Sequence, residues 1–217
     1  MISQVVIVAG GDETLWPEIT TYQGRETFWI GVDRGAYRLL KKGIVPDLAV
    51  GDFDSLSSAE LKEVEGVVSD IHYSIPEKDD TDTQLGLKLA LAKHPQAEVL
   101  ILGATGGRLD HFLSNLWLPL DPRFEEELQR IKLIDEQNTI TYFLPGDYVI
   151  EKEADKKYLA YVCLTAVTDL SLYDAKYRLE NYQVPRPMSF ASNEFIGDTS
   201  HFSFTSGVVA VIQSKDL

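Results

Sequence analysis

The chain has 217 residues, 44% hydrophobic and 25% charged, a composition typical of a soluble globular protein with one large or two small domains. Its formal net charge is -14, and such a charge disfavours nucleic-acid partners, because nucleic-acid binding needs cationic side chains to displace counterions. No apolar run approaches the roughly 18 residues of a membrane span, so no membrane partner is expected.

The N-terminus and the cysteine content indicate the compartment. The first residues, MISQVVIVAGG, lack a basic leader and are typical of a first strand, not of a signal peptide. The single cysteine, Cys163, excludes an internal disulfide framework. Because Cys163 lies in the apolar run YLAYVCLTAV, we expect a core thiol and not a nucleophile. Together these features favour a cytoplasmic protein.

Strand-like and helix-like segments alternate over the first 118 residues. The expected strands cover residues 3–11, 27–33, 47–53, 69–75 and 97–107. The expected helices cover residues 35–43, 57–67, 81–94 and 108–118. Continuous apolar strands that alternate with helices favour a parallel sheet covered on both faces. The sequence therefore predicts an α/β, Rossmann-like N-terminal domain.

Two of these helices begin with capping signals. Ser57 and Glu60 form a plausible capping box, and Thr81 is an expected N-cap with Asp82 in the first turn of its helix. That second helix has an apolar side: Leu85, Leu89 and Ala92 share one face, and Leu87 and Leu91 lie beside them.

The pattern changes between residues 119 and 130. From Lys132 onward, short strand-like segments follow one another, with turn residues such as Pro145-Gly146 and Ser206-Gly207 between them. This spacing is typical of a small all-β sandwich or barrel. We expect two domains: residues 1–125, an α/β domain, and residues 126–217, a smaller β domain.

Acidic residues gather in three loops that the predicted sheet brings to one edge. They are Asp33, Asp52, Asp54, Asp79, Asp80 and Asp82. Carboxylates brought together repel one another unless a cation neutralises them, and oxygen ligands suit a hard cation such as Mg²⁺. The alternative, that these are ordinary capping and turn aspartates, is harder to apply to Asp52 and Asp54, because strand alternation points both to the same side.

A glycine-rich turn follows the fifth strand. The segment GATGGRLDH covers Gly103 to His111 and opens a helix, so that the backbone can approach a phosphate at the helix N-terminus. Arg108 would add a charged fork. The segment matches neither the Walker pattern nor GxGxxG, and a tight turn with a surface arginine remains an alternative. An acidic cluster beside an anion site fits metal-dependent phosphoryl or nucleotidyl transfer.

Four motifs resemble those of the thiamine pyrophosphokinase family. They are DRGAYRLLKKGIVPDLAVGDFDS, EKDDTDTQLGL, GATGGRLDHFLSN, and SNEF followed by SGVVAVIQS. The resemblance covers nearly the whole chain. It implies that residues 1–125 bind ATP and Mg²⁺ and that residues 126–217 bind thiamine and form a dimer interface. It further implies a homodimer with active sites between the subunits. It also implies transfer of the pyrophosphoryl group of ATP to thiamine, giving thiamine diphosphate and AMP, with Mg²⁺ as the cofactor.

The resemblance also implies roles for particular residues. Three carboxylates would be catalytic and hold Mg²⁺, directly or through water: Asp52, Asp54 and Asp82. A second set would contact the phosphates or the nucleotide: Asp33, Asp79, Gly106, Gly107, Arg108 and Asp110. Two residues of the β domain would meet thiamine: Ser192 and Asn193. The family's DGG-like turn reads Asp-Arg-Gly here, so Arg34 is a departure.

A second departure concerns the vitamin. Some family members carry a C-terminal tryptophan that could stack on thiamine, whereas all three tryptophans here lie in the N-terminal part: Trp16, Trp29 and Trp117. Phe202 or Phe204 could substitute, although strand phenylalanines more often belong to a core. Two alternatives stay open: a related Mg-dependent pyrophosphokinase with another alcohol acceptor, such as a pterin, and a non-enzymatic nucleotide-binding module.

Overall fold

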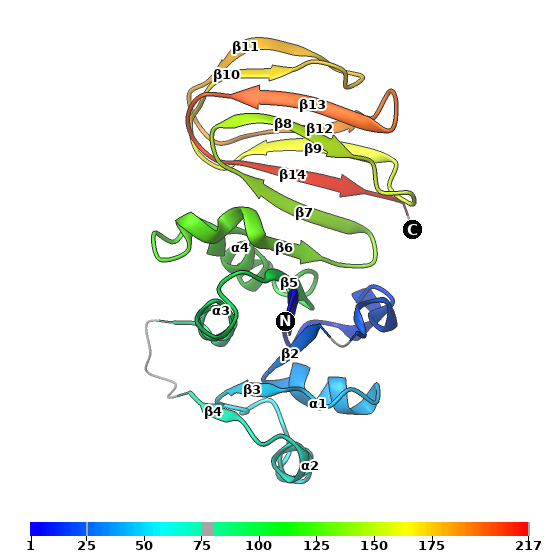
Figure 1. The fold of residues 1–217 in the computed structure, drawn as a ribbon, viewed down its shortest axis with the longest axis vertical. Coiled ribbons are helices and arrows are strands. Elements are labelled where there is room, and N and C mark those ends of the chain that lie inside the picture. Colours follow the sequence, from blue (N-terminus) through cyan, green and yellow to red (C-terminus); the bar gives the residue numbers. More distant parts are fainter. Residues whose placement is uncertain (25, 75–79, 217) are drawn as a thin grey trace. The chain divides into compact units, whose positions relative to one another are not determined.

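The computed structural model of the chain describes residues 1–24, 26–74 and 80–216 (Figure 1). Contacts between residues divide the chain into two units. The first comprises Met1–Leu118 with Leu133–Glu136, and the second comprises Pro119–Lys132 with Gln137–Leu217. The predicted domain boundary after residue 125 falls within the segment 119–132, which belongs to the second unit.

The N-terminal unit is built on parallel strands. They are β1 (Gln4–Val8), β2 (Thr27–Val32), β3 (Leu48–Gly51), β4 (Ile71–Tyr73) and β5 (Glu98–Leu102). Their order in the sheet is β5-β1-β2-β3-β4, and each neighbouring pair is parallel. β1 is fully apolar from Val5 to Val8, and these four residues are 0% exposed, as expected for a strand covered on both faces. The predicted α/β class with a parallel sheet is confirmed.

Helices cover both faces of this sheet (Figure 1). They are α1 (Arg34–Lys41), α2 (Ser58–Val67), α3 (Asp82–Lys93) and α4 (Leu109–Trp117), with the short 3-10 helices η1 (Glu13–Leu15) and η2 (Ile19–Tyr22). Gly31 of β2 packs against Ala36 of α1, and the next residue, Val32, packs against Gly86 of α3. Because successive strand residues point to opposite faces, α1 and α3 lie on opposite sides of the sheet.

Both predicted helix starts are confirmed. Ser57 and Glu60 form a reciprocal capping box at α2, and Thr81 caps α3 with Gln84 as its capping-box partner. Of the five apolar residues grouped on this helix, Leu87 is buried, and the other buried residues of α3 are Thr83, Gly86 and Ala90. A Cβ at Gly86 would lie 3.2 Å from Val32 Cγ2, so the helix approaches the sheet through small residues and leaves most of its leucines half-buried.

The C-terminal unit consists of antiparallel strands. After η3 (Leu118–Leu120), η4 (Glu125–Arg130) and β6 (Ile131–Ile134), they are β7 (Asn138–Phe143), β8 (Gly146–Glu151), β9 (Tyr158–Cys163), β10 (Val167–Leu172), β11 (Leu179–Val184), β12 (Met188–Glu194), β13 (Thr199–Phe204) and β14 (Val209–Ser214). One group pairs in the order β12-β9-β14-β7, and a separate four-stranded sheet has the order β11-β10-β13-β8.

Side chains from both groups of strands share one core. Tyr161 and Cys163 of β9 belong to the same buried cluster as Leu170 of β10 and Phe202 and Phe204 of β13. This arrangement is a sandwich, one of the two predicted forms. Cys163 is 1% exposed, and burial raises the pKa of its thiol to about 11, so the expectation of a core thiol is confirmed. Phe202 and Phe204 are also core residues.

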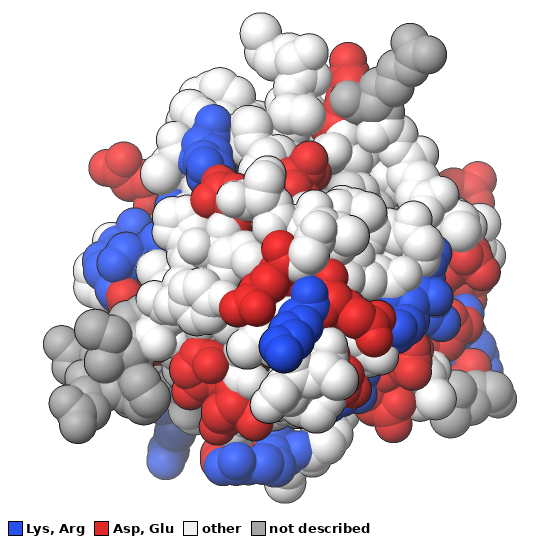
Figure 2. Space-filling view, turned by 90° about the horizontal axis from the view of Figure 1, so that it is seen from below, with Lys and Arg blue, Asp and Glu red and all other residues white. Residues whose placement is uncertain are grey.

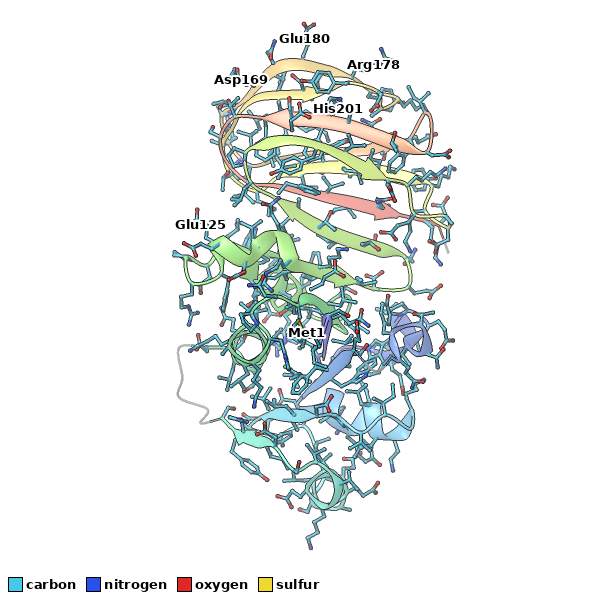
Figure 3. All side chains as sticks on the ribbon, viewed as in Figure 1. Met1, Glu125, Asp169, Arg178, Glu180 and His201 are labelled. Atoms are coloured by element: carbon cyan, nitrogen blue, oxygen red, sulfur yellow. The ribbon has the colours of Figure 1, made fainter. Side chains whose placement is uncertain are left out.

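The outer edge of the separate sheet is charged. β11 is an edge strand, and Figure 3 labels Arg178 just before it and Glu180 within it, both exposed. Charged side chains on an edge strand discourage pairing with other chains. None of the helices in the part of the chain that the structure describes is long and apolar enough to cross a membrane.

Candidate active site

The N-terminal unit contains a large cavity at the carboxyl end of its sheet. Along the chain, β2, β3 and β4 extend from one side of β1, whereas β5 returns to the other side. In such open sheets, ligands bind where the strand order reverses. The cavity here has a volume of about 890 Å³ and is lined by the segments that follow β1, β2, β3 and β5. This volume lies in the range of small-molecule sites, roughly 300–1,000 Å³.

The turns after β1 and β5 meet through backbone alone. The Gly11 N–H donates to the Gly103 carbonyl oxygen over 3.0 Å. A Cβ at Gly11 would lie 2.2 Å from that oxygen, and Gly103 has a φ of 66°, so both positions require glycine. Two glycine turns therefore line the cavity, and their main chain borders it without a bulky side chain.

Three carboxylates from three different loops converge on this cavity. Asp33 follows β2, Asp52 follows β3, and Asp82 begins α3. Each offers one oxygen, and these oxygens lie within 4.8 Å of one another. The sequence reasoning expected these three loops to share an edge, and the side chains of Asp33, Asp52 and Asp82 do meet there.

The other predicted acidic residues take different positions. Asp54 and Asp80 line the same cavity but are not part of the three-carboxylate group. Asp80 also forms an ion pair with Lys88, at 3.0 Å. Asp79 lies outside the described residues. The metal-binding role of Asp54 and the contact of Asp79 with the phosphates or the nucleotide therefore stay predictions.

A buried phenylalanine positions the loop after β3. The strand ends at Gly51, and Phe53 is 2% exposed in a cluster with Val64 of α2. Phe53 has a φ of 56°, and the Asp54 N–H donates to Asp52 Oδ1 over 3.0 Å. Asp52 and Asp54 both line the cavity, as expected, but they lie beyond the end of the strand and not in its alternating pattern. Instead the two residues flank a hydrophobic anchor in a tight turn.

The side chain of Asp33 is held against that loop. Its Oδ1 accepts the Phe53 N–H at 3.2 Å, and a Cβ at Gly51 would lie 1.8 Å from the same oxygen. Burial, followed by the negative charge of Asp82, raises the pKa of the Asp33 carboxyl to about 7, although the Phe53 N–H opposes the rise. Asp52 contributes in the same direction as Asp82. A cation between these carboxylates would relieve the repulsion, so the donor set fits a hard divalent ion.

The second glycine turn leads into α4. Gly106 and Gly107 have φ values of 75° and 64°, and no side chain caps the helix at Arg108. Arg108 instead forms an exposed ion pair with Asp110 at 2.5 Å, which lowers the pKa of the Asp110 carboxyl. All four residues line the cavity. The N–H groups of the helix N-terminus and a nearby guanidinium suit a phosphate.

Sequence reasoning missed one face of α4. His111, Ser114 and Asn115 line the cavity together, and Asn115 Nδ2 also donates to the Ala104 carbonyl oxygen over 3.0 Å. Their spacing of three and four residues is a helical repeat that places them on one face. That periodicity was present in the motif and could have identified these lining residues.

The two predicted thiamine contacts lie on β12 of the C-terminal unit. Ser192 is exposed with a φ of 58°, whereas Asn193 is 2% exposed. Asn193 Oδ1 accepts the N–H of Tyr177 and of Glu194, and its Nδ2 donates to the Tyr177 carbonyl oxygen. Asn193 thus ties β12 to the segment before β11, and contact of either residue with thiamine stays a prediction.

Comparison with known proteins identifies the family. The family model described as "Thiamin pyrophosphokinase, catalytic domain" matches residues 19–132, and that described as "Thiamin pyrophosphokinase, vitamin B1 binding domain" matches residues 147–209. The thiamine pyrophosphokinase of Bacillus subtilis (strain 168) is 41% identical over 212 residues, which cover 97% of this chain and 98% of the relative. The chain belongs to the thiamine pyrophosphokinase family.

Solved structures of the thiamine pyrophosphokinase family share the fold. A thiamin pyrophosphokinase family protein from Enterococcus faecalis is 52% identical, with a TM-score of 0.94 over 99% of this chain and 100% of that one. Thiamine pyrophosphokinase from Bacillus subtilis gives 0.88 at 39% identity, over 99% and 100% of the two chains. Thiamin pyrophosphokinase from Candida albicans, at 18% identity, shares the fold with a TM-score of 0.75 over 98% and 89%. The resemblance stated from the motifs is thereby confirmed.

Proposed function

We propose that the protein transfers the pyrophosphoryl group of ATP to the hydroxyl of thiamine, giving thiamine diphosphate and AMP. The observation that carries the proposal is the cavity of the N-terminal unit, where a three-carboxylate group and a glycine turn at a helix N-terminus line the same space. Membership of the thiamine pyrophosphokinase family supplies the acceptor.

The carboxylate group fits Mg²⁺ as the cofactor. Asp52 and Asp82 would hold the ion, and the geometry adds Asp33 to these two. Asp54, on the same turn, is a further predicted ligand, directly or through water. When bound, Mg²⁺ would supply positive charge that offsets the charge of the phosphates.

The rest of the cavity suits ATP. The α4 N-terminus with Gly106 and Gly107 would hold a phosphate, and Arg108 would exchange its partner Asp110 for the nucleotide. The thiamine hydroxyl oxygen would then attack the β-phosphorus, the bond from that phosphorus to the α-phosphate bridging oxygen would break, and AMP would leave. One of the cavity carboxylates would accept the hydroxyl proton. Holding a weak nucleophile in line is the main contribution of such a site.

The remaining proposals concern assembly and location. We propose that the C-terminal unit binds thiamine, with Ser192 and Asn193 as predicted contacts, and that the protein is a cytoplasmic homodimer with active sites between its subunits. Analytical ultracentrifugation measures the assembly directly: a mass of twice the 24.3 kDa chain supports it, and a monomer at micromolar concentration contradicts it.

A coupled assay of AMP release tests the proposed function. The protein is incubated with ATP, Mg²⁺ and either thiamine or a pterin alcohol. AMP release that depends on thiamine supports the proposal, whereas release that depends on the pterin alcohol supports the alternative acceptor. Nucleotide binding by calorimetry without AMP release for any acceptor would indicate a non-enzymatic binding module.

A further inference from the structure

Arg34 contacts one of the three loops that carry the acidic residues, the loop after β3, and directly follows another, the turn after β2. It is the first residue of α1, directly after Asp33, and it lines the cavity with its side chain 32% exposed. The next residue, Gly35, is confined, because a Cβ there would lie 2.0 Å from the Val8 carbonyl oxygen. In the Asp-Arg-Gly turn, glycine therefore occupies the position that has no room for a side chain, and Arg34 precedes it.

The guanidinium of Arg34 reaches across to the loop after β3. Nη2 donates to the carbonyl oxygen of Ser55, and Nη1 donates to Glu60 Oε1 over 3.3 Å. Ser55 directly follows Asp54, and Glu60 lies in the first turn of α2. One side chain thus connects the turn after β2 with the turn after β3.

Glu60 extends this connection to the end of the loop. Its Oε2 accepts the Ser57 N–H over 2.8 Å, while the Ser57 hydroxyl accepts the Glu60 N–H over 3.3 Å. The Ser57 N–H is the main cause, with Arg34 a smaller one, of a lowered pKa for the Glu60 carboxyl. Arg34 therefore binds an ionised partner that is itself fixed by the capping box of α2.

We propose that Arg34 is a positioning residue that fixes the Asp52–Ser55 loop relative to Asp33. This role deepens the proposed function. The expected effect of Arg34 on Mg²⁺ binding rests on that function, whereas its effect on the order of the loop does not. The loop is also held by the Phe53 anchor, by the Phe53 N–H bond to Asp33, by the local Asp54–Asp52 bond and by the Leu56 N–H bond to the Phe53 carbonyl oxygen. Arginine suits the role because its planar fork can donate to two acceptors at once, whereas a lysine offers a point charge.

The chain offers a matched control for this contact. Lys41 Nζ and Glu63 Oε2 form an ion pair at 2.6 Å that joins the same two helices, α1 and α2. Neither residue lines the cavity. Figure 2 shows Lys and Arg beside Asp and Glu over one face of the molecule, so ion pairs as such are not unusual on this protein. Of the two pairs that join α1 and α2 here, the one with Arg34 contacts the Asp52–Ser55 loop.

Hydrogen exchange tests the positioning role without reference to activity. The full chain and its Arg34→Gln, Glu60→Gln and Lys41→Gln variants are compared by mass spectrometry of peptides that cover residues 52–57. We expect exchange to be several-fold faster in Arg34→Gln and faster to a smaller extent in Glu60→Gln, with Lys41→Gln matching the unmodified chain. Exchange in Arg34→Gln equal to that of Lys41→Gln would overturn the proposal.

Calorimetric titration with Mg²⁺ alone tests the consequence for the metal. Supporting contacts around metal ligands typically change affinity by about 10- to 100-fold, so we expect Arg34→Gln to weaken Mg²⁺ binding by about 10-fold and Arg34→Lys by less. The Arg34→Gln, Glu60→Gln double variant should bind no more weakly than Arg34→Gln. Failure of the unmodified chain to bind Mg²⁺ would count against the proposed cofactor, while the exchange result would still decide the positioning role.

Steady-state kinetics separate positioning from direct contact with the nucleotide. With Mg²⁺ below saturation, we expect Arg34→Gln to lower kcat and to leave the KM for ATP within about two-fold, and added Mg²⁺ should restore part of the loss. A large rise in the KM for ATP with unchanged Mg²⁺ affinity would overturn the proposal and indicate that Arg34 binds the phosphates itself.

Discussion

Replacing Asp33 by Asn should stabilise the metal-free protein at neutral and alkaline pH. The folded protein raises the pKa of this carboxyl from its ordinary 3.8 to about 7, mainly through burial and the charge of Asp82. A folded pKa above the unfolded pKa means that the folded state binds the proton more tightly. The contribution of Asp33 to stability is therefore full below about pH 4, falls as the pH rises, and levels off above about pH 7.

The size of the effect follows from the same two pKa values. The difference between the folded and unfolded pKa corresponds to a change in the free energy of unfolding of about 4 kcal/mol, at about 1.36 kcal/mol for each pKa unit. Because Asp33 is only half-buried and partly screened by solvent, about 1–3 kcal/mol is the realistic expectation. Asn can still accept the Phe53 N–H through its Oδ1, so the hydrogen bond that holds the turn is retained.

Urea unfolding in the presence of a chelator measures this effect. All three tryptophans lie within Met1–Leu118, so their fluorescence reports on the unit that contains Asp33. The stability advantage of Asp33→Asn over the unmodified chain should grow between about pH 4 and about pH 7, and saturating Mg²⁺ should remove it. An advantage that is the same at pH 5 and pH 8, or a variant that is less stable at pH 8, would refute the reasoning.

Three further substitutions test the loop after β3, and a fourth, in α2, is a control. Phe53→Ala should lower the free energy of unfolding by about 3–5 kcal/mol, measured by urea denaturation, because it empties a buried site. Gly51→Ala should displace the side chain of Asp33 and lower turnover at least 10-fold, because the new Cβ would lie 1.8 Å from Asp33 Oδ1. The control Gly66→Ala places a Cβ in open space on α2, so it should keep full activity and raise the free energy of unfolding by up to about 1 kcal/mol. Asp54→Asn should abolish turnover and leave the circular dichroism spectrum unchanged; near-normal activity would remove Asp54 from the metal site.

Much of the fold could be predicted from the sequence because the sequence patterns that indicate strands and helix starts are local. Apolar strands, the two capping signals at Ser57 and Thr81 and the change of pattern after residue 118 each depend on a few neighbouring residues. Hydrophobicity alone groups Leu85 and Leu89 on the apolar face of α3, but both are only half-buried. The distance between helix and sheet, which only the tertiary structure fixes, selects Gly86 and Ala90 instead.

The site was predictable as far as chain topology determines it. Parallel strands bring their carboxyl ends together, so Asp33, Asp52 and Asp82 were expected at one edge. The conformation of the turn was not predictable, because Phe53 adopts a positive φ that its side chain disfavours, and burial of its ring compensates for this. The contact of Arg34 with the Ser55 carbonyl joins two loops and leaves no pattern in the sequence.

The most direct test of the central claim is a ³¹P NMR spectrum of the purified protein with ATP, thiamine and Mg²⁺. The proposed reaction predicts that ATP signals are replaced by those of AMP and thiamine diphosphate in equal amounts, and that a chelator stops the conversion. Formation of ADP with thiamine monophosphate, or no thiamine-dependent loss of ATP at all, would contradict it.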